Sequence, residues 1–289
     1  MQDTTSRAAR LALLAERIAD ADAILIGGGS GLSSAAGYEH YHWSGEMART
    51  LAPFRAYYGF TSPFAGFYHA YSRYSEQWGY YSQYMRFMRE ASTGQPYLDL
   101  RKLVGDKPTF VLSTNVDGQF ERVFDEAQIC NYQGSFLYCQ CSQPCTDEIW
   151  DNADLLTALT DALDPVTLSV PPELVPRCPH CGRVLVPWVR DDTFLQGAAW
   201  QAAYDRYRAF LREHLIDRPG KVVLLELGVG EMTPSIIKLP FWQLCQRNEG
   251  VFYATLNRTA RSAPSHLGDR ATFLEGDLAD TLRELRGIL

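Results

Sequence analysis

The stretch Ala23-Ile24-Leu25-Ile26-Gly27-Gly28-Gly29-Ser30-Gly31 decides the fold of this chain. Its four apolar residues predict a buried β-strand, and glycine and other small residues follow as far as Gly37. A strand, a glycine loop and small residues that open a helix bring backbone N–H groups to the place where a pyrophosphate binds. Leu32 stands in place of the third glycine of the dinucleotide fingerprint, and the acidic residue expected about 20 residues later is missing. We therefore predict a nucleotide loop unlike that of dehydrogenases; a glycine turn without a ligand is the alternative.

A second buried strand, Thr109-Phe110-Val111-Leu112, leads into Ser113-Thr114-Asn115-Val116-Asp117. A strand that ends in this way delivers Asn115 and Asp117 to the carboxyl edge of a sheet, where open α/β sheets bind ligands. A polar turn that caps the next helix is the alternative reading of the same residues.

Three further apolar runs continue the sheet towards the end of the chain. They are 222–227, followed by Gly228-Val229-Gly230; 251–256, followed by Asn257; and 271–274, followed by Glu275-Gly276-Asp277 and a last helix. Because a whole series of strands ends in glycine, an amide or a carboxylate, we expect a cofactor crevice along one edge of the sheet. The fold class is α/β, with a Rossmann-like parallel sheet.

The cysteines indicate a metal site. There are seven of them: Cys130, Cys139, Cys141, Cys145, Cys178, Cys181 and Cys245. Cys178-Pro179-His180-Cys181 has the spacing of a zinc knuckle, and Cys141 and Cys145 form the preferred partner pair for one tetrahedral Cys₄ zinc. Spacing alone does not exclude Cys139, and reduced or disulfide-bonded cysteines are the alternative. A closed structural zinc would take no part in chemistry.

Composition limits the partners and the compartment. The net charge of −7 and the pI near 5.4 disfavour electrostatic binding to nucleic acid. No apolar run approaches the roughly 18 residues of a membrane span. A signal peptide is not visible, and the odd cysteine count argues against a secreted disulfide framework. We expect a cytoplasmic monomer that binds neither nucleic acid nor a membrane.

The chain divides into a large domain and two insertions. An amphipathic helix is expected near residues 5–20, and a long helix begins at Ala198. The predicted units are a Rossmann-like nucleotide-binding domain (1–37, 97–137 and 191–289), a helical insert (38–96) and a zinc-binding module (138–190). The insert contains ten of the sixteen tyrosines, and aromatic residues at this density more often pack helices than bind a ligand.

Four polar residues have weaker patterns. His40 and His42 could reach a ligand pocket, but histidines in an aromatic loop are more often surface or packing residues. Asp191 and Asp192 follow Trp188-Val189-Arg190, where a solvated turn is the simpler interpretation.

These motifs together resemble the sirtuin family over nearly the whole chain. In that family a Gly-Ala-Gly-x-Ser loop opens the fold, as Gly27-Gly28-Gly29-Ser30-Gly31 does here, and Thr114-Asn115-Val116-Asp117 matches the segment that reads the nicotinamide ribose. Gln133 in Tyr132-Gln133-Gly134 takes the place of the catalytic histidine, and Glu39-His40-Tyr41-His42 replaces a Pro-Asp-Phe-Arg segment. With the segments 140–145 and 186–192, these departures are similar to the macrodomain-linked class of sirtuins.

The resemblance implies a set of site residues and partners. The catalytic residues would be Asn115, Asp117 and Gln133; the residues binding NAD, as co-substrate, would be Gly27, Gly28, Gly29, Ser30, Ala35, Gly228, Val229, Gly230, Asn257, Asp277 and Leu278. Members of the class transfer ADP-ribose to lipoyl-carrier proteins of the glycine-cleavage H type. A protein of that type is therefore the expected substrate, and a macrodomain hydrolase is a further expected partner.

The glutamine decides the predicted reaction. A deacylating sirtuin uses histidine as a base near neutral pH, because the ordinary pKa of histidine is about 6.5. Glutamine does not titrate in water, so Gln133 can orient the ribose by hydrogen bonds but cannot accept that proton. The steps that do not need this base are still possible: the bond between ribose C1′ and nicotinamide is cleaved, and a nucleophile of a protein substrate captures C1′. A deacylase that compensates for the lost base, an NAD hydrolase and an NAD-binding module without activity are the alternatives.

Overall fold

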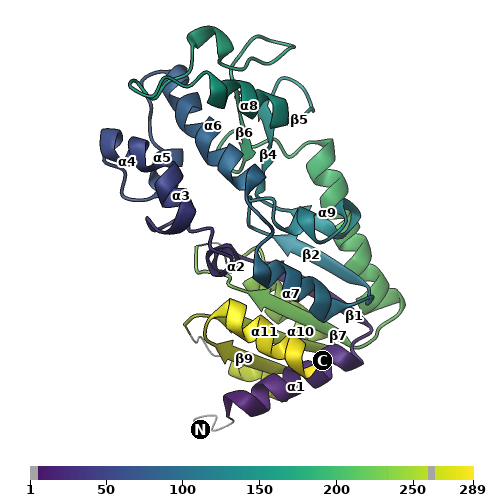
Figure 1. The fold of residues 1–289 in the computed structure, drawn as a ribbon. Helices are drawn as coiled ribbons and strands as arrows, with labels where there is room; N and C mark the ends of the chain where they lie inside the picture. The colour runs from purple at the N-terminus through teal and green to yellow at the C-terminus, as the bar shows by residue number, and fades with distance from the viewer. Residues whose placement is uncertain (1–5, 233, 260–263) are drawn as a thin grey trace.

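Six parallel strands form the sheet of the large lobe, in the order β3-β2-β1-β7-β8-β9 (Figure 1). The structure is a computed structural model that describes residues 6–232, 234–259 and 264–289. The strands are β1 (Ala23–Gly28), β2 (Thr109–Ser113), β3 (Ile129–Asn131), β7 (Val222–Leu227), β8 (Val251–Asn257) and β9 (Ala271–Glu275). The five strands predicted from apolar runs are confirmed. β3 was not predicted, because three residues are too short to show a periodic pattern.

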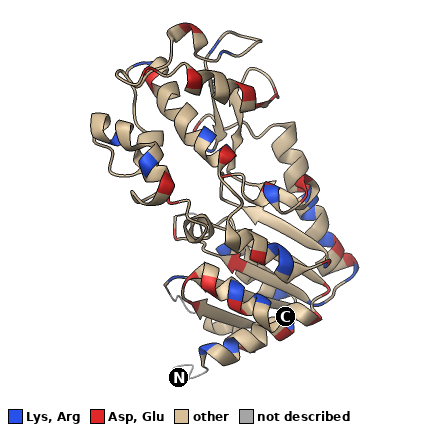
Figure 2. Cartoon of the chain, in the orientation of Figure 1, with Lys and Arg blue, Asp and Glu red and all other residues tan. Residues whose placement is uncertain are grey.

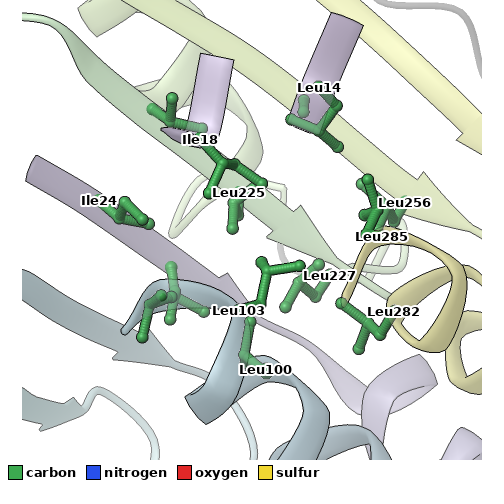
Figure 3. Packing of buried hydrophobic residues seen from close by; sticks show 14 of the residues in the cluster. Leu14, Ile18, Ile24, Leu100, Leu103, Leu225, Leu227, Leu256, Leu282 and Leu285 are labelled. Carbon is green, nitrogen blue, oxygen red and sulfur yellow. The ribbon is translucent and has the colours of Figure 1, made fainter. Parts of the chain in front are cut away.

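Helices cover both faces of the sheet, and neighbouring residues of each strand point to opposite faces. One face is covered by α1 (Arg7–Asp20), α7 (Gln95–Val104) and α11 (Leu278–Ile288), and the other by α9 (Ala198–Arg212) and α10 (Lys238–Arg247). Figure 3 shows the first core, where Leu225 and Leu227 of β7 lie among leucines of α7 and α11. The expected helices at both ends of the chain and at Ala198 are confirmed, except that residue 5 lies outside the described part.

The strand order creates a crevice at the carboxyl ends of the central strands. From β1 the chain proceeds to β2 and β3 on one side, and it later returns to β7 on the other side of β1. Ligands of open α/β sheets bind where the order reverses in this way. The short helix α2 (Ser30–Ala35) begins at this point, directly after the glycine loop.

The helical insert and the cysteine-containing segment together form a second lobe. Its three-stranded antiparallel sheet has the order β5-β4-β6. Its elements are α3 (Gly45–Thr50), α4 (Ala52–Tyr58), α5 (Pro63–Phe67), α6 (Tyr74–Glu90), β4 (Gly134–Cys141), β5 (Trp150–Asp151), α8 (Ala153–Asp161) and β6 (Leu185–Val189). Short helical turns lie at Phe120–Arg122, Glu126–Gln128, Pro172–Leu174, Glu213–Asp217 and Ser265–Arg270.

One hydrophobic core joins the two segments of this lobe. Trp78, Tyr80 and Tyr84 of α6 are buried against residues of β4, α8 and β6, and the Trp78 indole donates to Leu185 O at 3.1 Å. These aromatic residues therefore pack helices, as their density predicted.

The charged residues are distributed over both lobes. Figure 2 shows basic and acidic residues interleaved along the helices of the large lobe. Among the described residues, none of the helices combines the length and the apolar character that crossing a membrane requires.

Candidate active site and metal centre

A cavity of about 220 Å³ lies at the carboxyl edge of the sheet, where the two lobes meet. Its lining comes from both lobes: the glycine loop, the loops after β2 and β7, the helical insert, the start of β4 and the end of β6. The lining residues are Gly29, Ser30, Ser33, His40, Tyr41, Phe64, Phe67, Tyr68, Tyr84, Thr114, Asn115, Val116, Gln133, Phe136, Val189, Arg190, Val229, Gly230 and Met232. Six of the predicted site residues are among them, although they are spread from position 29 to position 230.

A second cavity of about 190 Å³ continues this space along α2. Ser30 and Tyr41 border both cavities, so the two are neighbours. Four more predicted residues line the second cavity: Ala35, Asn257, Asp277 and Leu278. Two of them also order the surrounding backbone, because Asn257 Nδ2 donates to Val229 O at 3.1 Å and Asp277 caps the start of α11. The two cavities form a trough that an elongated ligand could occupy.

Three predicted glycines serve packing and border neither cavity. Gly27 and Gly28 lie within β1, where an added Cβ would come within 2.4 Å of Ile237 and of Phe120, respectively. Gly228 has a φ of +62° and leaves no room for a Cβ beside the backbone of Gly31. Their predicted roles in cofactor binding are therefore at most indirect.

The loops after β1 and β7 touch backbone to backbone. A Cβ on Gly29 would lie 2.6 Å from Val229 Cα, and Gly31 N donates to Gly228 O at 2.9 Å. Gly230 differs, because a Cβ there would meet no protein atom within 4 Å. Gly230 is thus a position in the cavity wall where a ligand could approach the backbone closely.

Asn115 is a buried residue that ties the glycine loop to the strand beside it. Its Nδ2 donates to Gly29 O at 3.0 Å and lies 3.3 Å from the hydroxyl of Tyr97. Its backbone N–H donates to Ser113 Oγ at 3.0 Å. The amide therefore sets the position of the loop in addition to bordering the cavity.

Asp117 is buried behind the cavity and does not line it. Its carboxylate accepts hydrogen bonds from the Ser33 hydroxyl and from the backbone N–H of Gln119. The predicted catalytic role of Asp117 would therefore be exerted from behind the wall, where His40 and not Asp117 borders the cavity. Burial lowers the pKa of the His40 imidazole, and the negative charge of Asp117 opposes this effect in part.

His40 lines the cavity, which was the less favoured of the two interpretations of the sequence at His40 and His42. Its Nδ1 lies 2.6 Å from the hydroxyl of Tyr84, and the side chain is buried, whereas His42 is exposed. Burial lowers the pKa of His40 below its ordinary value, and the charges of Asp117 and Glu39 oppose this effect only in part. His40 is therefore mostly neutral near pH 7. Its position depends on packing against α6, which no local pattern reveals.

Arg190 is a cavity residue without a predicted role. Its guanidinium lies over the rings of Phe194 and Tyr132, 4.5 Å and 5.1 Å from the ring centroids, and donates to Tyr132 O. Its backbone N–H donates to Gln133 O at 3.0 Å, so the two residues face the cavity side by side. The sequence signal that could have identified Arg190 is a basic residue directly after an apolar strand. Asp191 caps an exposed turn, in agreement with the solvated turn expected there.

The four predicted cysteine ligands form one cluster in the second lobe. The Sγ atoms of Cys141, Cys145, Cys178 and Cys181 all lie within 4.8 Å of one another. Two pairs, Cys141 with Cys181 and Cys145 with Cys178, are each 3.6 Å apart. Sulfur atoms about 2.3 Å from a tetrahedral zinc ion are roughly 3.8 Å apart, so the donor set fits zinc.

Cys139 lies outside this cluster. It is buried in the hydrophobic core, where the Asn152 amide approaches its Sγ at 3.7 Å, and burial raises the pKa of its thiol to about 12. The preference for Cys141 and Cys145 therefore agrees with the geometry.

Comparisons with known proteins give relatives and a fold. No family model matches the chain. It is 31% identical over 272 residues to a protein ADP-ribosyltransferase of Staphylococcus aureus (strain Mu50), across 92% of this chain and 84% of the relative. It is 28% identical over 246 residues to a "probable bifunctional ADP-ribose hydrolase/ADP-ribosyltransferase" of Fusarium oxysporum f. sp. cubense, across 83% of this chain and 41% of that longer protein.

Solved structures share the fold at low identity. A Sir2 homolog in complex with NAD superposes with a TM-score of 0.62, at 15% identity, over 96% of this chain and 94% of that chain. Sir2Tm bound to a propionylated peptide gives a TM-score of 0.57, at 15% identity, over 96% and 99%. The predicted fold class, a sirtuin-like parallel sheet with a small zinc-binding module, is confirmed.

The contact between the glycine loops predicts a contrast in stability. Gly29→Ala should destabilise the protein by about 1–3 kcal/mol, because its Cβ would overlap the backbone of Val229. Gly230→Ala should change the free energy of unfolding by less than about 0.5 kcal/mol, since its Cβ has open space. Denaturant titration measures both values. Equal effects of the two substitutions would contradict the packing described here.

The cysteine cluster predicts the consequence of metal loss. Cys181→Ser should remove bound zinc and lower the unfolding free energy by roughly 4 kcal/mol, or about 10 °C in Tm. Metal analysis and thermal unfolding measure the two effects. Cys139→Ser is the matched control and should keep its zinc while losing about 1–2 kcal/mol through burial of a hydroxyl. Loss of zinc from the control would assign Cys139 to the metal.

The burial of His40 predicts a pH effect on stability. Its folded-state pKa lies below the unfolded value of about 6.5, so the unfolded chain binds more protons in the window just below that pH. The unfolding free energy should fall as the pH is lowered from 7 through this window, by about 1.4 kcal/mol for each pKa unit. His40→Gln should make the fall shallower, and His42→Gln, at an exposed site, should not. Identical slopes in all three proteins would contradict the prediction.

Proposed function

This chain belongs to the sirtuin-fold protein ADP-ribosyltransferases, and from that membership we propose that it transfers ADP-ribose from NAD to a lipoyl-carrier protein of the glycine-cleavage H type. The enzyme class follows from the relative in Staphylococcus aureus. The choice of substrate protein and the roles of single residues are our proposal.

The trough fits NAD as the co-substrate. Its two cavities run from Gln133 past the glycine loop to Asp277, and Gly230 leaves its wall open to a close ligand. A Sir2 homolog of the same fold was solved as an NAD complex. When bound, NAD supplies the ADP-ribosyl group through cleavage of the bond between ribose C1′ and nicotinamide. The chain's own contribution is to hold the ribose beside Asn115 and Gln133.

The position of Gln133 is the observation on which the proposal depends. Gln133 lines the cavity together with Asn115, and its amide can hydrogen-bond to a ribose but cannot take up a proton. Asn115 also fixes the glycine loop through its hydrogen bond to Gly29 O. An acceptor group of a protein substrate would reach the ribose from the side of the second lobe.

The wall on that side suits an apolar arm. Phe64 and Phe67 of α5, Phe136 of β4 and Val189 of β6 line the cavity opposite the glycine loop. A lipoyl group on a lysine is a long aliphatic chain that could lie against such a surface. The relative in Fusarium joins an ADP-ribose hydrolase and a transferase in its name, which supports a macrodomain hydrolase as the partner that removes the modification.

NAD-dependent deacylation is the second candidate, and one observation favours it. His40 lines the same cavity, is mostly neutral near pH 7 and has Asp117 behind it, so it could serve as the base that Gln133 cannot be. Sir2Tm, with the same fold, was solved with a propionylated peptide.

One mass measurement separates the candidates. The protein is incubated with NAD and a lipoylated or acylated H-type carrier, and the carrier mass and free nicotinamide are measured. We expect the carrier to gain one ADP-ribosyl group for each nicotinamide released. Loss of the acyl or lipoyl mass would instead show deacylation, and nicotinamide without any change in the carrier would show hydrolysis of NAD.

Two variants test the residue roles in the same assay. Asn115→Ala should lower nicotinamide release by about 100-fold or more, because the ribose site and the glycine loop both lose a partner. His40→Gln should leave ADP-ribosylation largely intact if Gln133 and Asn115 suffice, and should abolish any deacylation. Loss of ADP-ribosylation in His40→Gln with unchanged folding would assign His40 to the transfer itself.

A further inference from the structure

A buried ion pair lies beneath the loop that connects β7 to α10. Glu226 of β7 is fully buried, and the Lys238 ammonium at the start of α10 donates to its Oε1 at 2.6 Å, with only 8% of the lysine side chain exposed. Thr255 donates to the same oxygen at 3.2 Å, and Tyr253 donates to the other oxygen at 2.7 Å. Burial and the carboxylate raise the pKa of Tyr253, so its hydroxyl keeps the proton that it donates.

The two charged residues flank the loop that forms one wall of the cavity. Val229, Gly230 and Met232 of this loop line the cavity. Glu226 fixes the strand just before the loop, and Lys238 fixes the helix just after it. Lys238 Nζ also lies 4.0 Å from Glu231 Oε1, within the loop itself. The pair thus joins both ends of the loop and touches its middle.

Stability alone does not account for such a pair. Removing two charges from water costs several kcal/mol for each ion, and well-packed apolar residues of similar volume are often as stable or more stable. An ion pair with fixed hydrogen bonds additionally defines the relative positions of the segments that carry the two charges. On the opposite side of Glu226, its neighbour in the sheet is Gly27, which has no side chain and lies directly before the glycine loop. The pair therefore sits under both loops of the trough.

We propose that Glu226 and Lys238 are positioning residues, which hold the described residues 228–232 of the loop after β7 in the conformation that binds the dinucleotide. The proposal rests on the proposed function for the identity of the ligand, but the position of the loop can be tested without it. Asn257 supports the same loop from β8, through its bond to Val229 O, and so acts together with the pair.

The main test is Lys238→Met, which keeps the length of the side chain and removes the charge. The Kd for NAD should rise by about tenfold, a usual size for coupling between two sites. Hydrogen exchange in the loop should become faster than in the neighbouring strands. Lys238→Arg should largely restore both properties, since it returns a charged donor.

A double variant separates positioning from general loss of structure. In Lys238→Met the buried Glu226 carboxylate has lost its cation. The double variant Glu226→Gln/Lys238→Met should recover stability while the loop still exchanges faster than in the parent.

An exposed ion pair provides the matched control. Lys221 and Asp20 are also 2.6 Å apart, but more than half of each side chain is exposed. Lys221→Met should change neither the Kd for NAD nor exchange in the loop. Lower stability of Lys238→Met with unchanged exchange and Kd would overturn the inference. If the parent protein binds no NAD, the proposed function fails, and hydrogen exchange of the loop alone then decides the inference.

Discussion

The trough depends on the direct contact of two backbones. The loops after β1 and β7 approach so closely that Gly29, Gly31 and Gly228 leave no room for a Cβ, and hydrogen bonds from Gly29 N to Leu227 O and from Gly31 N to Gly228 O hold them together. Because β1 and β7 are the strands between which the connections reverse, this contact lies at the base of the crevice. Most of the glycines that look like a ligand fingerprint are thus required by the protein's own packing.

The strands of the sheet and half of the metal cluster could be predicted from the sequence, because each depends on residues that are close neighbours in the chain. Five apolar runs gave five strands, and the spacing of Cys178 and Cys181 gave one side of the metal cluster. The roles of His40 and Lys238 depend on contacts that no local pattern shows, with Tyr84, 44 residues later, and with Glu226, 12 residues earlier. The hydrophobic core that the insert shares with the cysteine-containing segment could not be predicted either. Its residues come from two separate stretches of sequence, and no local pattern shows that the two pack together.

The polar groups of the cavity are arranged so that few of them are charged. Gln133 does not titrate, and His40 is kept mostly neutral by burial, although Asp117 lies behind it. The Arg190 guanidinium lies over two aromatic rings. For the proposed reaction, a cationic nicotinamide ring in this cavity would meet neutral dipoles, aromatic faces and the Arg190 cation, and no carboxylate among the described residues of the wall. Such surroundings would favour departure of nicotinamide as a neutral molecule over retention of the cationic ring.

The cysteine cluster and the cavity lie at opposite ends of the same two strands. Gln133 directly precedes β4, which ends at Cys141, and Arg190 directly follows β6, which begins shortly after Cys181. Gly134 and Cys141 pair with Val189 and Leu185, so the two ends of the pairing lie roughly 13 Å apart, which is beyond the distance at which a metal could coordinate a ligand in the cavity. A metal at the cluster would instead fix the separation of β4 and β6 at one end. The pairing of Gly134 with Val189 holds the strands together at the other end, beyond a register shift between Ser135 and Cys139. A structural metal would thereby hold together the two strands that bring Gln133 and Arg190 to the cavity wall, without itself reaching the cavity.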